Sequence, residues 1–505
     1  MSEQQTKAGH RSRPTGAAFA AFMAQGWAPE TGGSVEQAAV ASYARQRRNA
    51  ISAAFPGERL VVPAGGLKVR SNDTDYVFRP HSAFAHLSGL GADREPDAVL
   101  VLEPLADGGH EAVLYLQPPA GRDSAEFYAD SRMGEFWIGP RPSLQDVASE
   151  LALTTRHLSE LADALGKDVP TVALRIVRDA DQDVAAMVEG IRAQRTLDAD
   201  QSSELVARDD QDADLELARA LSTARLVKDE WEIEQMVAAV EATAEAFDAV
   251  VADLGHAVTR ERGERWVEGV FGLHARATGN GVGYDSICAS GEHATTLHWI
   301  RNTGAVHDGD LLLLDAGVET DALYTADVTR TLPVNGTFSP AQRRVYDAVL
   351  AAQEAGLAAA RPGNQFKDVH GAAIRVIAET LHSWGLLPEG VGVEETLDPE
   401  NGQFHRRWMV HGTSHHLGID VHDCALALRE EYMDGELREG MVITVEPGLY
   451  FKSDDSLVPP ELRGIGVRIE DDVVITADGC RNLSEMLPRS ADDVQEWIRR
   501  GGRRD

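Results

Sequence analysis

Cysteine, lysine and long hydrophobic runs are scarce in this 505-residue chain. The three cysteines, Cys288, Cys424 and Cys480, lie far apart and form no C-x-x-C pair, which argues against a disulfide framework or a zinc–thiolate cluster and fits a reducing compartment. Lysine provides only six of the 48 basic residues, and 81 acidic residues give a formal net charge of −33. A chain this acidic is a poor partner for nucleic acid or for an anionic membrane surface. No run reaches the roughly 18 apolar residues that a membrane-spanning helix requires.

The first 30 residues resemble an export signal only weakly. Lys7, Arg11 and Arg13 precede an alanine-rich stretch, but that stretch is short, weakly hydrophobic and interrupted by Gln25 and Gly26. We therefore expect a cytoplasmic protein that binds neither nucleic acid nor a membrane.

The length of the chain predicts two domains, because 505 residues exceed what one hydrophobic core comfortably serves. We expect an extension over residues 1–34, an α/β domain with a mixed sheet over 35–220, a second domain over 221–490 and a tail over 491–505. In the first domain the hydrophobic spacing predicts helices at 35–53, 144–165 and 181–195, and strands at 59–65, 76–79, 97–104, 111–118 and 171–177. In the second domain it predicts long helices at 229–254, 260–278, 340–360 and 367–384.

Five residues with metal-binding side chains close or interrupt short apolar, strand-like runs in the second domain. They are Asp315 in "LLLLDAG", Asp327 in "LYTADVTRT", His415 in "HGTSHHLGIDVHD", Glu446 in "MVITVEPG" and Glu470 in "GVRIEDDVVIT". A carboxylate at the end of a buried strand is costly unless a cation compensates its charge. Four carboxylates and one imidazole, with a carboxylate shared between sites, are a donor set for two divalent cations. Such a site generates hydroxide at neutral pH and polarises a carbonyl or phosphoryl group.

The local sequence around three of these residues favours a rigid mount for a ligand. Pro447 biases Glu446 towards extended backbone and ends its strand. The two-residue period of a strand places Arg468, Glu470 and Asp472 on one face. Thr329 lies two residues beyond Asp327, so its hydroxyl is expected to share the face of that carboxylate.

Each motif alone has a more ordinary explanation: an Asp after four leucines is usually a turn residue, and an isolated "EPG" is usually a plain turn. The metal hypothesis depends on all five occurring together in one stretch of the chain. Competing motifs are missing, since the sequence has no H-E-x-x-H pair, no G-x-S-x-G elbow and no G-x-x-x-x-G-K-[ST] loop.

The ordered strings "TLHWIRN", "LLLLDAG", "ADVTRTLPVNG", "HGTSHHLGIDVHD", "TVEPGLYF" and "GIGVRIEDD" resemble aminopeptidase P, the Xaa-Pro aminopeptidase branch of the pita-bread metallopeptidases. The likeness is strong over about residues 225–490 and weaker upstream, through "YVFRPHSAFAHLSGL" at 76–90. It implies a pita-bread catalytic domain preceded by a smaller, creatinase-like α/β domain. It also implies release of the first residue from peptides with proline second, by a metal-bridging hydroxide that attacks the Xaa-Pro carbonyl.

The resemblance also implies a role for each site residue. Asp327 and Glu470 would bridge two metal ions, Asp315 would complete one coordination sphere, and His415 and Glu446 would complete the other. Glu446 would in addition exchange protons with the attacking water and the leaving nitrogen.

Five further residues match family positions around the substrate. His298 and His422 match two histidines near the scissile peptide, and His411, Tyr450 and Arg468 match residues on the proline side. The chain departs from many relatives at His416, which stands where they have an aromatic residue, and we expect this change to alter the shape of the pocket but not to abolish metal binding.

Two other functions stay open at this point. Prolidase, an Xaa-Pro dipeptidase, shares the fold and the ligands. The sequence around "HGTSHHLGIDVHDCA" and the large amino-terminal domain nevertheless favour the aminopeptidase. A non-catalytic pita-bread binding protein would have lost its ligands, and here all are present. The hard, carboxylate-rich donor set favours Mn²⁺, with Co²⁺ or Zn²⁺ as alternatives. The resemblance further implies a homodimer or homotetramer.

Overall fold

The computed structural model describes residues 16–28, 35–168, 171–196 and 203–504, and the side chains of 194–208 are not part of that description. The chain divides into two compact units, Met1–Gly89 with Asp93–Asp214, and Leu90–Ala92 with Leu215–Asp505. Most of the predicted extension at 1–34 lies outside the described residues; within it, helix α1 spans Ala17–Met23.

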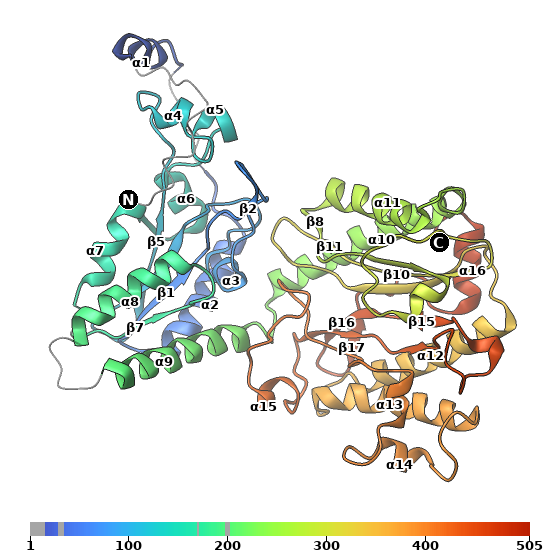
Figure 1. The fold of residues 1–505 in the computed structure, drawn as a ribbon. Helices are drawn as coiled ribbons and strands as arrows, with labels where there is room; N and C mark the ends of the chain where they lie inside the picture. The colour runs from blue at the N-terminus through green and yellow to red at the C-terminus, as the bar shows by residue number, and fades with distance from the viewer. Residues whose placement is uncertain (1–15, 29–34, 169–170, 197–202, 505) are drawn as a thin grey trace. The chain divides into compact units, whose positions relative to one another are not determined.

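The first unit is built on a five-stranded mixed sheet in the order β6-β5-β4-β1-β7 (Figure 1). Strand β1 pairs antiparallel with β4 and parallel with β7, and β5 pairs antiparallel with β4 and parallel with β6. The central strands are mostly apolar, with β1 buried throughout and β4 buried over its first four residues, as expected where both faces of a sheet are covered. The strands are β1 (Arg59–Pro63), β2 (Val69–Ser71), β3 (Thr74–Asp75), β4 (Val99–Pro104), β5 (His110–Leu116), β6 (Thr154–His157) and β7 (Leu174–Ile176). The helices after α1 are α2 (Val40–Ala54), α3 (Ser82–Ser88), α4 (Glu126–Ala129), α5 (Glu135–Ile138), α6 (Leu144–Leu151), α7 (Leu161–Gly166), α8 (Gln182–Thr196) and α9 (Ser203–Ala224).

Two predicted elements of this unit are wrong. Residues 76–79 form no strand, since Tyr76 and Val77 are more than half exposed and Pro80 soon follows. The single helix predicted over 144–165 is two helices with strand β6 between them, because Ala152 takes a left-handed conformation that ends α6.

The second unit contains short antiparallel strands between long helices. Strand β10 lies between β12 and β9, β16 lies between β13 and β17, and β14 pairs with β15. The strands are β8 (Gly281–Val282), β9 (Ile287–Ser290), β10 (Leu311–Ala316), β11 (Val318–Glu319), β12 (Val328–Pro333), β13 (Val442–Val445), β14 (Gly448–Tyr450), β15 (Gly466–Arg468), β16 (Asp471–Ile475) and β17 (Cys480–Asn482). The helices are α10 (Glu230–Val258), α11 (Gly263–Thr278), α12 (Pro340–Ala359), α13 (Phe366–Ser383), α14 (Val393–Leu397), α15 (Arg429–Tyr432) and α16 (Ala491–Arg499).

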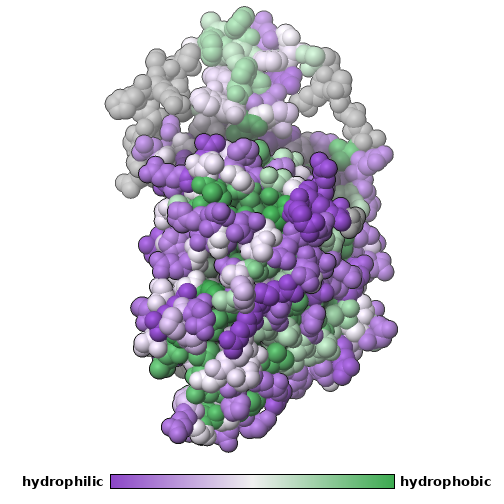
Figure 2. Space-filling model, turned by 90° about the vertical axis from the view of Figure 1, so that its right-hand side faces the viewer, coloured by the Kyte–Doolittle hydropathy of each residue, from purple (hydrophilic) through white to green (hydrophobic). Residues whose placement is uncertain are grey.

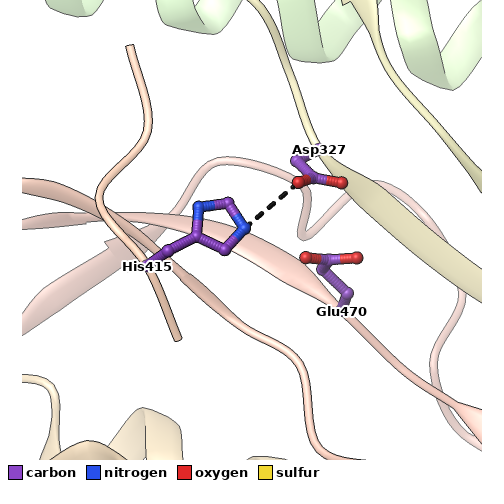
Figure 3. A group of neighbouring side chains, drawn as sticks. All are labelled: Asp327, His415 and Glu470. Carbon is purple, nitrogen blue, oxygen red and sulfur yellow. Dashed lines mark ion pairs between the residues drawn. The ribbon is translucent and has the colours of Figure 1, made fainter. Parts of the chain in front are cut away.

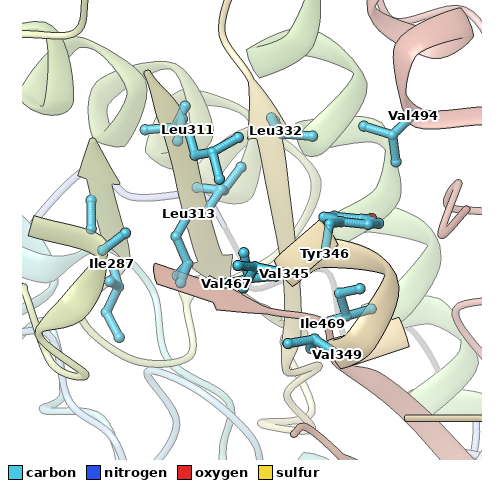
Figure 4. Close-up of a cluster of buried hydrophobic side chains, with 14 of the residues drawn as sticks. Ile287, Leu311, Leu313, Leu332, Val345, Tyr346, Val349, Val467, Ile469 and Val494 are labelled. Atoms are coloured by element: carbon cyan, nitrogen blue, oxygen red, sulfur yellow. The ribbon is translucent and has the colours of Figure 1, made fainter. Parts of the chain in front are cut away.

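The helices of this unit cover both sides of its strands. Helices α10 and α11 lie on the side of β10, and α12 and α13 lie on the side of β16 and β17 (Figure 1). Leucines of β10 and β12, valines of α12, Val467 of β15 and the nearby Ile469 meet in one core (Figure 4). Burial of these side chains is the main driving force that fixes the strand ends in place.

Capping residues set where the long helices begin. At α10, the Asp229 carboxylate accepts from the Glu232 amide at 3.0 Å and the Glu232 carboxylate accepts from the Asp229 amide at 3.0 Å. At α12, Ser339 caps the helix and Pro340 occupies its first turn.

The carboxy-terminal segment differs from the tail predicted over 491–505. It contains α16, whose Val494 and Trp497 are buried in the main core of the second unit. Hydrophilic residues cover much of the face drawn in Figure 2, as expected from the strongly acidic composition. Over the described ranges, every helix is too short or too polar to cross a membrane.

Candidate metal centre

Segments far apart in the sequence of the second unit bring the five predicted ligands to one cavity of about 570 Å³. Asp315 lies in β10 opposite Thr329 of β12, and Asp327 lies just before β12. Glu446 directly follows β13, and Glu470 lies between β15 and β16. The Glu470 amide donates to the Thr329 carbonyl at 3.1 Å, which ties the segment between β15 and β16 to β12 at the site.

Three of the ligands form the centre of the cluster. Asp327, His415 and Glu470 each offer one donor atom within 4.8 Å of the others' (Figure 3). The His415 Nε2 atom lies 3.2 Å from an Asp327 oxygen and 3.7 Å from a Glu446 oxygen. Asp315 joins the cluster through Tyr284, whose hydroxyl lies 2.7 Å from Asp315 Oδ1 and 2.5 Å from Asp327 Oδ1. The structure thus assembles the five residues that the sequence singled out.

Polar neighbours orient these carboxylates. The Thr329 hydroxyl donates to Glu470 at 2.6 Å, so it serves Glu470 and not Asp327 as the sequence had suggested. The Asp327 amide donates to Asp472 at 3.0 Å, and Asp472 is fully buried. Such outer contacts fix the rotamers of metal ligands.

Sequence reasoning missed Tyr284. Its phenol is the group shared by Asp315 and Asp327, yet it lies 31 and 43 residues before them. Nothing in "GYDSIC" marks it as functional, because only the fold brings the phenol to the carboxylates.

Burial and crowding leave the carboxylates poorly compensated. Burial, with the neighbouring charge of Asp327, raises the pKa of Glu470 well above its usual range, and burial also raises the pKa of Asp315. Burial raises the pKa of Glu446 to about 8, against the opposing charges of His415 and Arg468. Burial lowers the pKa of His415, but the hydrogen bond to Asp327 and the charges of Asp327 and Glu446 outweigh it and raise that pKa to about 9.

Divalent cations fit this donor set. In their absence the buried carboxylates can reach low energy only by holding protons, whereas a cation would compensate several of them at once. Carboxylate oxygens and one imidazole are suitable ligands for hard or borderline divalent metals.

The residues predicted on the proline side form a connected group. His411 Nε2 lies 2.8 Å from the Tyr450 hydroxyl, and Arg468 Nη1 donates to the same oxygen at 3.1 Å. Arg468 also forms an ion pair with Asp315, so this group contacts a ligand directly. His411 and Arg468 line the cavity, while Tyr450 stands behind them.

Two predicted catalytic histidines lie exposed at the cavity. His298 and His422 both line it. The ring of His422 packs edge-on against that of His415, with ring centroids 4.5 Å apart. The ring of His422 is only partly withdrawn from solvent, but this partial burial lowers its pKa and favours a neutral ring.

His416 does not line the cavity itself, although the Tyr432 ring on which it packs does. The ring of His416 is fully buried, stacked on Phe366 at 4.9 Å and edge-on to Tyr432 at 4.6 Å. It lies outside the cavity lining because the chain turns His415 and His416 to opposite sides, as in a strand.

The chain is similar to known proteins over nearly its whole length. Residues 234–477 match the model of metallopeptidase family M24, and residues 43–173 match the model of the aminopeptidase P N-terminal domain. Xaa-Pro aminopeptidase 1 of Streptomyces coelicolor is 51% identical over 477 residues, which cover 94% of this chain and 91% of the relative. The Xaa-Pro aminopeptidase of Escherichia coli is 32% identical over 90% of this chain and 96% of its own.

Solved structures agree with these sequence matches. A zinc-substituted Escherichia coli aminopeptidase P in complex with product superimposes with a TM-score of 0.77 at 29% identity, covering 92% of this chain and 99% of that one. With its mixed-sheet first domain, its pita-bread second domain and its assembled ligand cluster, the chain belongs to the Xaa-Pro aminopeptidases of metallopeptidase family M24.

Proposed function

We propose that this protein is a metal-dependent aminopeptidase that releases the first residue from peptides with proline at the second position. The observation that carries the proposal is the convergence of Asp315, Asp327, His415, Glu446 and Glu470 on one cavity, in a chain that is 51% identical to a named Xaa-Pro aminopeptidase.

The five ligands would hold two divalent cations, which supply Lewis acidity and a water that ionises near neutral pH. Asp327 and Glu470, the two carboxylates of the central group of three, would both help to hold these ions, with Asp315, His415 and Glu446 as the remaining ligands. The hard donor set favours Mn²⁺ over Co²⁺ or Zn²⁺.

Glu446 is the proposed proton carrier. Its carboxylate lies 3.7 Å from His415 Nε2 and 3.6 Å from His411 Nδ1, at the wall of the cavity. With the cations bound, the ionised carboxylate could accept a proton from the attacking water and later deliver it to the proline nitrogen.

His298 and His422 are the proposed donors to the scissile carbonyl. Both rings reach the cavity from outside the ligand cluster, so they can hydrogen-bond a carbonyl oxygen as it gains negative charge. His411, Tyr450 and Arg468 would shape the proline side. The carboxylates would attract the free α-amine, which favours cleavage after the first residue.

Prolidase activity is the alternative to exclude, since it would use the same metal ligands. The intact ligand cluster speaks against a non-catalytic binding protein. A cytoplasmic location and a homodimeric or homotetrameric state remain predictions.

A substrate panel tests the proposal. We expect metal-loaded protein to release the first residue from Xaa-Pro-Yaa tripeptides and longer peptides, and to leave matched peptides with alanine second uncut or much slower. Cleavage confined to Xaa-Pro dipeptides would assign the protein to the prolidases. No cleavage of any Xaa-Pro bond by metal-loaded protein would contradict the proposed function altogether.

A further inference from the structure

The loop that carries His298 is fastened to helix α11 by one buried carboxylate. Glu264 is 0% exposed and accepts from the Ser290 amide at 2.9 Å, the Trp299 indole at 2.8 Å and the Gly304 amide at 2.5 Å. The same carboxylate lies 2.7 Å from His293 Nδ1. One side chain of α11 therefore holds both ends and the middle of the segment 290–304.

The middle contact sits next to His298. Trp299 turns its indole inward to Glu264, whereas Leu297, His298 and Ile300 line the cavity. The Trp299 ring also stacks on His293, with centroids 3.9 Å apart and planes 23° apart. Anchoring Trp299 fixes the backbone that presents the His298 ring.

The end of the loop, at Gly304, also packs closely against the start of α11. The Glu264 amide donates to the Gly304 carbonyl at 3.1 Å, so the two residues are bonded in both directions. A Cβ atom at Gly304 would lie 2.8 Å from the Glu264 carboxyl carbon and 2.7 Å from His293 Cε1. Only glycine allows this approach without a shift of the loop.

We propose that Glu264 and Trp299 are positioning residues that hold His298 at the substrate. The inference rests on the proposed function, in which His298 donates to the scissile carbonyl. Neither residue is among the metal ligands, and neither lines the cavity, so their effect would pass through the loop. A displacement of a catalytic group by about 1 Å can lower turnover about 100-fold.

The test is Trp299→Phe, which removes the indole N–H but keeps an aromatic ring against His293. Glu264 still accepts from Ser290 and Gly304 in this variant, so the fold should persist. We expect kcat on an Xaa-Pro-Yaa tripeptide to fall roughly 10- to 100-fold, with smaller changes in KM, metal content and melting temperature. Trp266→Phe is the matched control, because that indole donates to Asp253 at an exposed position of the same helix.

A double-mutant cycle separates positioning from general destabilisation. In a His298→Ala background, Trp299→Phe should lower kcat no further, because the group that it positions is already gone. Equal losses of kcat in both backgrounds, or an unchanged kcat in the single variant, would overturn the inference. If Trp299→Phe fails to fold, the same cycle is run with Glu264→Gln.

The activity of the wild-type protein separates a failure of the positioning role from a failure of the proposed function. Wild-type cleavage of the tripeptide with an additive cycle would leave the proposed function intact and overturn only the positioning role. A wild-type protein without Xaa-Pro cleavage would overturn both.

Discussion

At the residue scale, Glu446 combines two roles that usually fall to different side chains. It lies within reach of His415 and His411, and burial raises its pKa to about 8. We predict that Glu446→Gln lowers kcat by about 100- to 10,000-fold, because an amide can neither accept the proton nor compensate a cation. Glu439→Gln is the control, because Glu439 is exposed and lies shortly before β13, the strand that leads to Glu446. This change should leave kcat unchanged. Near-normal turnover in metal-loaded Glu446→Gln protein would remove the proton-carrier role.

His416 is a buried polar residue whose two ring nitrogens make no hydrogen bond to the described residues around it. Burial also lowers its pKa well below the usual range. We predict that His416→Phe raises the free energy of unfolding by about 1–3 kcal/mol, because it removes two unsatisfied buried polar atoms between Phe366 and Tyr432. Denaturant unfolding measures the free energy of unfolding of both proteins, and an activity equal to that of the wild type shows that the site is intact. A loss of stability in the variant would mean that the ring nitrogens of His416 have hydrogen-bond partners after all.

The four carboxylate ligands were predictable because each is a costly charge within or next to a short apolar strand. Asp315 and Glu446 stand out for that reason even without the resemblance. The residues that orient them were not predictable, because their partners are far away in sequence. Tyr284 bonds residues 31 and 43 positions away, and Thr329 bonds Glu470, 141 positions away.

At the scale of elements, the long periodic helices of the second unit were well predicted. Four of the five strands predicted in the first unit are also observed, as β1, β4, β5 and β7, whereas a half-exposed strand was missed. The helix predicted at 340–360 is observed as α12 at Pro340–Ala359, with a proline and a serine cap to mark its start. Strand β6 was missed, because "TTRH" is half-exposed and, among the described residues, pairs with the distant strand β5. Its existence depends on the completed sheet, which local propensity does not report.

The hairpin between β10 and β12 sets the separation of two ligands. Gly317 follows β10, and a Cβ atom there would lie 1.7 Å from the Ala326 carbonyl oxygen, next to Asp327. We predict that Gly317→Ala lowers the free energy of unfolding by about 1–3 kcal/mol. It should also weaken metal binding, because the hairpin must open between Asp315 and Asp327.

Gly269→Ala is the control for this change. Gly269 lies exposed in α11 with open space around its Cβ position, so alanine should stabilise that helix by about 0.5–1 kcal/mol. Thermal unfolding and metal titration of both variants make the comparison. Wild-type metal affinity in Gly317→Ala protein would show that the hairpin tolerates the added methyl group.

At the scale of the whole molecule, the metal ions should act as part of the fold. Glu446 and His415 hold protons more tightly in the metal-free folded protein than their ordinary pKa values of 4.5 and 6.5 allow. For both groups the folded state therefore binds more protons than the unfolded state, and stability falls as pH rises. The Glu446 contribution is lost between about pH 4.5 and 8, and the His415 contribution between about 6.5 and 9.

Bound cations replace these protons, so the stabilisation by metal should grow with pH. We predict that the difference in melting temperature between metal-loaded and metal-free protein increases from pH 6 to pH 9. Free metal at about 100 times the Kd adds roughly 2.7 kcal/mol for each site. Calorimetry at pH 6, 7.5 and 9 checks this, and a difference that stays constant or shrinks with pH would contradict the assigned protonation of the empty cluster.

The measurement that bears most directly on the account is metal content against activity in one sample. Protein freed of metal by a chelator is titrated with Mn²⁺, and bound metal per chain is determined by elemental analysis alongside the rate of Xaa-Pro-Yaa cleavage. The account predicts no activity in metal-free protein and full activity at close to two divalent ions per chain. Full activity in protein that carries no metal would contradict it.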